Sequence, residues 1–293
     1  MLKVKTPKNP RVKRALEKRA PKLVETGKKT LILQGTKTSN TLNDVLTELY
    51  LLKKGSAIRY TRKNENIRPF ESGGETSLEF FSLKTDCSIF IYGSTSKKRP
   101  DNLVIGRTYD HHIYDLVEVG VENFKPLNSF IYDKKLAPRV GSKPFICFVG
   151  EGFESVEELK HLKEVLVDLL RGEVIENLNL AGLDHAYVCT AVSSNRVFFT
   201  HCALRLKKSG TIVPRMELVE VGPSMDFVVR RHRLPNESLR KEAMKTAKDQ
   251  SKKKLGDMAL PNKAKGVKRE RREAKMKNNP TERASKKQKE ESA

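Results

Sequence analysis

The sequence predicts an α/β protein of the α+β type, made of two similar halves whose helices pack on mainly antiparallel sheets. The pentapeptide LVEVG occurs twice, at residues 116–120 and again at residues 218–222. The same order of expected elements, a strand, a helix and then a meander of strands, leads to each copy. A repeated string within a repeated order of elements indicates an internal duplication.

The net charge of +22 is concentrated at the two ends of the 293-residue chain. Residues 1–30 carry eleven Lys and Arg against two acids, and residues 233–293 carry twenty against nine. Residues 31–232 are nearly neutral, with twenty-seven bases and twenty-five acids. Lysine-rich arms on a neutral body are typical of proteins that bind a polyanion, and the usual polyanion is nucleic acid.

The first half begins with a buried strand at residues 31–35, followed by a helix for which Thr38 or Ser39 supplies the N-cap. Leucine and valine recur along that helix with the spacing of one apolar face, and Gly55 ends it. These apolar positions are Leu42, Val45, Leu46, Leu49 and Leu52. The remaining strands of this half are expected at residues 78–83, 87–92 and 102–109, and the basic loop 94–101 joins the last two.

The second half repeats this order, with a strand at residues 145–149, a turn at 150–152 and a helix whose apolar face runs from Val156 to Leu169. Strands are then expected at residues 186–192, 197–206, 211–221 and 225–229. Gly222-Pro223 is expected to break the chain between the last two. Because Pro214 cannot donate a ladder hydrogen bond, we expect the strand 211–221 to lie at an edge that a partner protein completes.

These patterns divide the chain into a basic arm at 1–26, a folded region at 27–233, a basic helical extension at 234–260 and a disordered basic tail at 261–293. The halves of the folded region are expected at 27–135 and 143–233. Short helices are expected over residues 11–19 and over residues 236–254, where Asn236 is the cap. The tail is assigned to disorder because charged and small residues dominate it without an apolar period.

The four cysteines, Cys87, Cys147, Cys189 and Cys202, stand singly within apolar runs. Since there is no CxxC pair, we expect buried reduced thiols, and not a metal site or a disulfide framework. The sequence shows neither an apolar run long enough to span a bilayer nor an apolar signal segment at its start.

No catalytic constellation is recognisable, so we expect a protein that is not an enzyme and that uses no cofactor or metal. Gly150-Glu151-Gly152 follows a strand and opens a helix, but the third glycine of a dinucleotide fingerprint is missing and Glu151 would repel a pyrophosphate. The six histidines show none of the spacings typical of metal ligands, such as HxxxH.

The candidate contacts with RNA are cationic. Arginine binds phosphate with a planar fork, whereas lysine acts as a point charge. The residues predicted to bind RNA are Lys97, Lys98, Arg99, Arg107, Arg230, Arg231, Arg233, Arg240, Lys241 and Lys245. Aromatic residues form 6% of the chain, include no tryptophan and mostly fall inside expected strands. We therefore expect recognition of the RNA backbone and shape more than stacking on bases.

Three long strings resemble the Brix-domain family. They are RKNENIRPFE at residues 62–71, KTDCSIFIYGSTSKKRPDNLVIGRTYD at residues 84–110 and MELVEVGPSMDFVVRRHR at residues 216–233. The EVGP element at residues 220–223 is similar to the C-terminal signature of that family. The resemblance covers roughly residues 27–245, and its closest branch holds large-subunit assembly factors of eukaryotes.

This resemblance implies two halves that are each similar to an anticodon-binding domain. It also implies a nucleolar protein that forms a heterodimer with the regulator of ribosome synthesis protein. The pair would bind 5S rRNA and its two ribosomal proteins, place them on the precursor of the large subunit and support processing of the precursor rRNA. The alternative is a protein-interaction scaffold of the nucleolus whose arms bind RNA without selectivity.

Overall fold

The computed structural model describes residues 9–11, 14, 28–71, 73–172, 182–211 and 213–244. The chain divides into two units, Met1–Ala243 and Met244–Ala293, and every helix and strand given below lies in the first. The described residues do not include most of the helix expected at 11–19, the part of the extension beyond Met244, the site residue Lys245 or the tail. The boundaries expected for the arms and halves therefore stay predictions.

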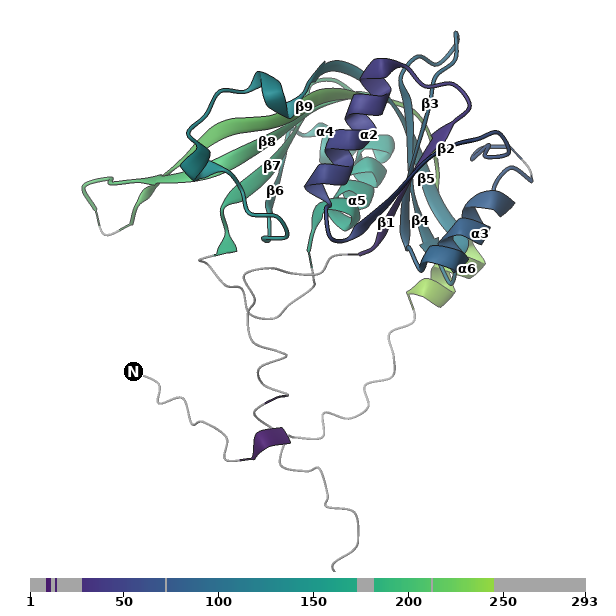
Figure 1. The fold of residues 1–293 in the computed structure, drawn as a ribbon, viewed down its shortest axis with the longest axis horizontal. Helices are drawn as coiled ribbons and strands as arrows, with labels where there is room; N and C mark the ends of the chain where they lie inside the picture. The colour runs from purple at the N-terminus through teal and green to yellow at the C-terminus, as the bar shows by residue number, and fades with distance from the viewer. Residues whose placement is uncertain are drawn as a thin grey trace, which may run out of the picture. The chain divides into compact units, whose positions relative to one another are not determined.

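The strands of the described residues form one nine-stranded sheet, in the order β2-β1-β3-β4-β5-β9-β8-β7-β6 (Figure 1). Their bounds are β1 Thr30–Gly35, β2 Ala57–Asn64, β3 Ile89–Ser94, β4 Asn102–Tyr109, β5 His112–Lys125, β6 Phe145–Val149, β7 His185–Ala191, β8 Arg196–Lys207 and β9 Arg215–Arg233. Two of these strands, β2 and β6, form the outer edges of the sheet.

The pairing pattern of the sheet repeats and confirms the two similar halves. In the first half β1 runs parallel to β3, and β3, β4 and β5 follow as antiparallel neighbours. In the second half β6 runs parallel to β7, and β7, β8 and β9 follow in the same way. The two LVEVG copies lie on β5 and β9, which pair antiparallel at the centre of the sheet. The duplication thus gives one continuous sheet.

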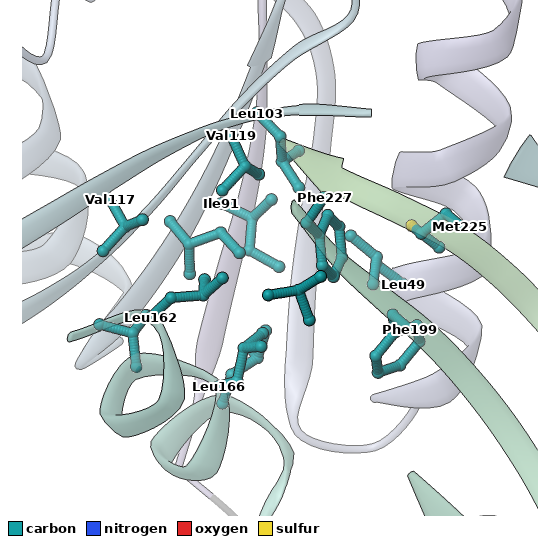
Figure 2. Close-up of a cluster of buried hydrophobic side chains, with 14 of the residues drawn as sticks. Leu49, Ile91, Leu103, Val117, Val119, Leu162, Leu166, Phe199, Met225 and Phe227 are labelled. Atoms are coloured by element: carbon teal, nitrogen blue, oxygen red, sulfur yellow. The ribbon is translucent and has the colours of Figure 1, made fainter. Parts of the chain in front are cut away.

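Helices α2 (Asn40–Leu52) and α5 (Glu157–Leu170) pack on the same face of this sheet and share one core. The Ser39 hydroxyl accepts from the Leu42 N–H, which confirms the expected N-cap of α2. Figure 2 shows Leu49 of α2 and Leu162 and Leu166 of α5 meeting side chains from both halves of the sheet. The short helix α4 (Gly152–Ser155) leads into α5. This core is continuous across the two halves, and the first half has a second, smaller core on the opposite face of the sheet.

Helix α3 (Thr76–Thr85) covers the opposite face of the first half, and the strand predicted at residues 78–83 is wrong. Helical spacing buries Leu78 and Ser82, one turn apart, while it leaves Phe80 exposed. Asp86 ends the helix in the left-handed conformation with φ of 53°, and its N–H bonds to the Ser82 carbonyl. The run SLEFFSL has a β-prone composition, but its buried positions follow the helical period.

Strand β9 runs without a break through Gly222-Pro223, so the two strands expected there are one. The register with β8 shifts at this point, and His201 Nδ1 lies 2.6 Å from the Gly222 carbonyl oxygen. Strand β9 as a whole is central, but the edge predicted for residues 211–221 is confirmed for the part of that segment that lies in β9, which has a neighbour on one side only. Its first part, residues 215–220, pairs with β8 alone.

Three of the four cysteines are buried as expected, but Cys147 is exposed. It lies on the outer face of β6, between Phe145 and Val149, and in the described residues no helix covers that face.

The remaining short elements are η1 (Leu127–Ser129), η2 (Lys134–Leu136) and α6 (Glu237–Ala243). None of the helices in the described ranges is both long and apolar enough to cross a membrane.

Candidate nucleic-acid interface

Two cationic clusters that lie 130 residues apart in the sequence meet at one surface. Because β5 pairs with β4 on one side and β9 on the other, the loop that precedes β4 and the end of β9 flank the same stretch of β5. The contact is direct, since Arg230 Nη2 donates to the Pro100 carbonyl at 2.8 Å. Arg230 Nη1 also donates to Asn102 Oδ1 at 2.8 Å. The structure therefore brings together the loop and the β9 arginines.

Glu118 of β5 lies beneath this surface and holds it together. Its side chain is almost completely buried, and Oε1 accepts from Asn102 Nδ2 at 2.7 Å. Arg231 Nη2 lies 3.3 Å from the same oxygen, and Arg99 Nη1 lies 3.4 Å from it. A buried carboxylate is tolerated only when cations and hydrogen-bond donors surround it, as they do here.

Gly120 makes room for Arg230. A Cβ atom added at Gly120 would clash with the Arg230 guanidinium, which crosses over this residue on its way to Pro100. Arg231 is fixed differently, because its guanidinium lies 4.0 Å from the centre of the Phe70 ring, at the distance of a cation–π contact. The first LVEVG copy thus supplies both the acid and the glycine that position the arginines of β9.

The surface above these contacts carries an excess of positive charge, and we call it the Glu118 patch. It consists of Lys97, Lys98, Arg99, Arg230 and Arg231. Lys97 and Lys98 are exposed and make no ion pair within the described part of the chain. Arg99 and Arg231 share the single charge of Glu118 and keep about two-fifths of their side chains exposed, 42% and 38%. The patch therefore contains five cations, and the one buried carboxylate that it contacts, Glu118, pairs with only two of them.

Arg107 lies elsewhere, in a buried network between the halves. Its Nε is 3.0 Å from both carboxylate oxygens of Asp115, and its Nη1 is 2.7 Å from Asp168 Oδ2 on α5. His161 of α5 also approaches Asp115, at 2.9 Å. Burial opposes ionisation of Asp115, but hydrogen bonds from His161 and Arg107 outweigh it and keep the pKa of Asp115 below its ordinary value. Only 15% of the Arg107 side chain is exposed, so Arg107 has a structural role in this network.

The Glu118 patch does not include three other residues predicted to bind RNA, Arg233, Arg240 and Lys241. Arg233 forms an ion pair with Glu75, which precedes α3. Arg240 and Lys241 lie exposed on α6, where Lys241 Nζ is 3.9 Å from a carboxylate oxygen of Glu237. In the described region these residues supply solvated charge near the point where the basic extension leaves the fold.

A cavity of about 630 Å³ lies between the end of α2, the segment 137–144 and strands β7 and β8. Burial lowers the pKa of Lys53 to about 8 and the pKa of His201 to about 4, so His201 is neutral at neutral pH. His201 Nδ1 faces a carbonyl oxygen, which can only accept, so this nitrogen carries the proton.

Within the described residues, no group of three or more His, Cys, Asp or Glu side chains is placed to hold a metal ion.

A comparison with protein-family models matches residues 35–231 to the Brix domain. The chain belongs to the Brix-domain family. The match spans both halves of the sheet, from the end of β1 to the end of β9, and so includes the Glu118 patch.

Curated relatives cover nearly the whole chain. It is 68% identical over 299 residues to the Ribosome production factor 2 homolog of Arabidopsis thaliana, with 94% of this chain and 95% of the relative covered. It is 45% identical to the protein of the same name from Homo sapiens, with 84% and 78% covered. It is also 39% identical to the Ribosome biogenesis protein RPF2 of Saccharomyces cerevisiae, with 85% and 74% covered.

Sequence reasoning found the cations of the Glu118 patch but missed Glu118, Asn102 and Phe70, which position them. A signal was present, since Glu118 is the single acid within the otherwise apolar LVEVG string of β5. An acid inside a buried strand requires a cationic partner. Which cations meet it depends on the pairing of β5 with β9, and no local pattern gives that pairing.

Proposed function

We propose that this protein is an assembly factor of the large ribosomal subunit that acts on 5S rRNA. In this proposal it forms a heterodimer with the regulator of ribosome synthesis protein in the nucleolus. The pair binds 5S rRNA and its two ribosomal proteins and incorporates that particle into the large-subunit precursor, which supports processing of the precursor rRNA.

Membership of the Brix-domain family and the relatives named for ribosome production make the chain a ribosome biogenesis factor. A role on RNA is supported by one observation above all, the meeting of two distant cationic clusters over Glu118. Such a surface is fixed by the fold, so it can select the shape of an RNA, whereas unstructured charge only raises the affinity for any polyanion. The basic arms would then strengthen binding that the Glu118 patch orients.

An uncovered edge strand in the second half of the fold, β6, supports the proposed heterodimer. In the first half, strand β2 and helix α3 cover the outer edge and outer face of β1. The equivalent strand of the second half, β6, pairs only with β7 among the described strands. Its outward side chains Phe145 and Val149 are 39% and 51% exposed, and it carries no charge to discourage pairing with another chain. We propose that the protein partner covers β6.

The RNA part of this proposal is tested by replacing Lys97 and Lys98 with alanine in the full-length protein. The matched control replaces Lys134 and Lys135, another pair of adjacent exposed lysines, in η2. Filter binding to 5S rRNA and to an unrelated RNA of equal length is compared at several salt concentrations. We expect the Lys97/Lys98 variant to lose affinity for 5S rRNA and to lower the log–log salt slope by up to about 2, since each lost phosphate contact removes about 0.7 to 0.9.

Selectivity separates this proposal from the alternative of a scaffold with unselective RNA affinity. The Lys97/Lys98 variant should lose more affinity for 5S rRNA than for the unrelated RNA, and the Lys134/Lys135 variant should lose little for either. Equal losses in both variants and on both RNAs would contradict the proposed site and favour the scaffold.

A further inference from the structure

Strand β2 and helix α3 expose a group of aromatic and basic side chains that the Glu118 patch does not include. Tyr60 of β2 is 38% exposed and Phe80 of α3 is 54% exposed. Arg62, Lys63 and Lys84 are exposed on the same two elements. We call these five residues the β2–α3 surface. Exposed aromatic side chains that gather at one place commonly mark a binding surface.

The rings of this surface are held in a connected row. Phe81 lies between the other two, with its ring centre 5.7 Å from that of Tyr60 and 5.8 Å from that of Phe80. Phe81 also packs against the core beneath α3, so it anchors the row to the fold. Tyr60 and Phe80 are therefore held by a partly buried neighbour while they remain open to solvent.

The row is flanked by positive charge. Lys84 Nζ lies 5.6 Å from the centre of the Phe80 ring. Lys63 and Phe81 line a cavity of about 280 Å³ at the end of β2, and Glu65 is the one acid in that lining. Other acids nearby already have partners, since Glu71 pairs with Arg68 and Glu75 with Arg233. In the described part of the chain, no ion pair involves Arg62, Lys63 or Lys84.

We propose that the β2–α3 surface binds single-stranded RNA, with bases stacked on Tyr60 and Phe80 and phosphates on Arg62, Lys63 and Lys84. Aromatic platforms beside lysine and arginine are how proteins bind unpaired nucleotides, because every base has a stacking face and every linkage has a charge. A purely apolar partner would not match the three cations. This inference rests on the proposed RNA function and adds an unpaired segment of that RNA as the ligand.

The inference reverses the expectation that stacking is less important than backbone recognition. The earlier expectation rested on aromatic residues that fall inside predicted strands. Residues 78–83 were predicted to form such a strand, in which alternation buries every second side chain. In the helix that forms instead, Phe80 faces away from Leu78 and Ser82 and reaches solvent beside Lys84.

The first test measures base stacking directly. The full-length Tyr60→Ala/Phe80→Ala variant and the wild type are titrated with a 12-nucleotide single-stranded RNA and with an abasic strand of the same length. We expect the wild type to prefer the base-bearing strand and the variant to lose about tenfold or more of its affinity for that strand, with an unchanged salt slope. Binding of the abasic strand should be the same in both. The thermal unfolding midpoint checks that the variant remains folded.

A matched control distinguishes stacking from general apolar contact. Leu83 is 60% exposed on the same helix but has no ring, so Leu83→Ala should leave RNA binding unchanged. If Leu83→Ala costs as much affinity as the double variant, or if the wild type binds both strands equally, the stacking proposal is overturned. The latter result would leave RNA binding by the Glu118 patch intact, whereas failure to bind either strand or 5S rRNA would overturn the proposed function itself.

The absence of tryptophan from the sequence permits a second test. Tyr60→Trp gives a single tryptophan that retains a stacking face, and Phe145→Trp places one on β6 at the other end of the sheet. The base-bearing strand should quench the fluorescence of Trp at position 60 and leave that at position 145 unchanged, while the abasic strand should quench neither. Equal quenching at both positions would contradict a site on β2 and α3.

Discussion

Asp115 and Glu118 are buried acids on the same strand, and they organise arginines on opposite faces of the sheet. Asp115 faces α5 and fixes Arg107 between the two halves. Glu118 faces the other way and fixes Arg99 and Arg231 at the surface. The separation of three residues places them on opposite sides, because side chains alternate along a strand. One arginine becomes structural and the others stay available to a ligand.

The structural role of Asp115 predicts a large loss of stability in Asp115→Asn. The change removes a buried negative charge from Arg107 and His161, and breaking a buried ion pair costs about 3–5 kcal/mol. The control is Asp86→Asn, which breaks the exposed Lys29–Asp86 pair of 3.1 Å and should cost well under about 1 kcal/mol. Urea unfolding of both full-length variants measures the difference. Equal midpoints would show that the network does not hold the halves together.

Among the elements of the fold, β6 is an edge strand without a fully buried residue. Its counterpart β1 is buried by β2 and α3, and these two elements lie in the connection that runs from Lys53 to Ser88. The corresponding connection in the second half, residues 171–184, is much shorter. Compared with the first half, the described residues of the second half therefore lack an added strand or helix beside β6. A partner protein that supplies one would remove an apolar edge from water.

This predicts that Val149→Lys weakens the heterodimer by about tenfold or more, because a charge would be buried within the contact. Val213→Lys is the control, since Val213 is 72% exposed at the turn between β8 and β9. Hydrogen exchange on the wild type should show protection of residues 145–149 when the partner binds. Unchanged exchange there, together with wild-type affinity of the Val149→Lys variant, would place the partner elsewhere.

The sequence predicted elements well wherever apolar spacing was regular. Helices α2 and α5 and strands β1, β3, β4, β6, β7 and β8 lie close to their expected positions. The prediction failed at α3, where consecutive apolar residues concealed a helical period, and β2 was missed because its exposed face reads as polar loop. It also failed at Gly222-Pro223, where the side chain of His201 contacts a carbonyl oxygen at the register shift within a continuous strand.

For the whole molecule, the sequence indicated where charge lies along the chain but not where it lies in space. Lys97 to Arg99 and Arg230 to Arg231 were recognisable as cationic clusters from their composition. Their meeting over Glu118 depends on the pairing of β5 with β9, which joins the two halves. The same long-range pairing leaves Arg107 between the halves, a position that resembled a surface site in the sequence. Tertiary pairing, more than composition, thus decides which cations can meet RNA.

We propose that fixed surfaces of the fold, and not the arms alone, direct this protein to 5S rRNA and the large-subunit precursor. Ultraviolet crosslinking in cells, read at nucleotide resolution and combined with identification of the crosslinked peptides, tests it most directly. We predict enrichment of 5S rRNA and large-subunit precursor rRNA, with crosslinks on the Glu118 patch and the β2–α3 surface. Crosslinks that follow RNA abundance and map only to residues 1–26 and 244–293 would contradict a role for these two surfaces.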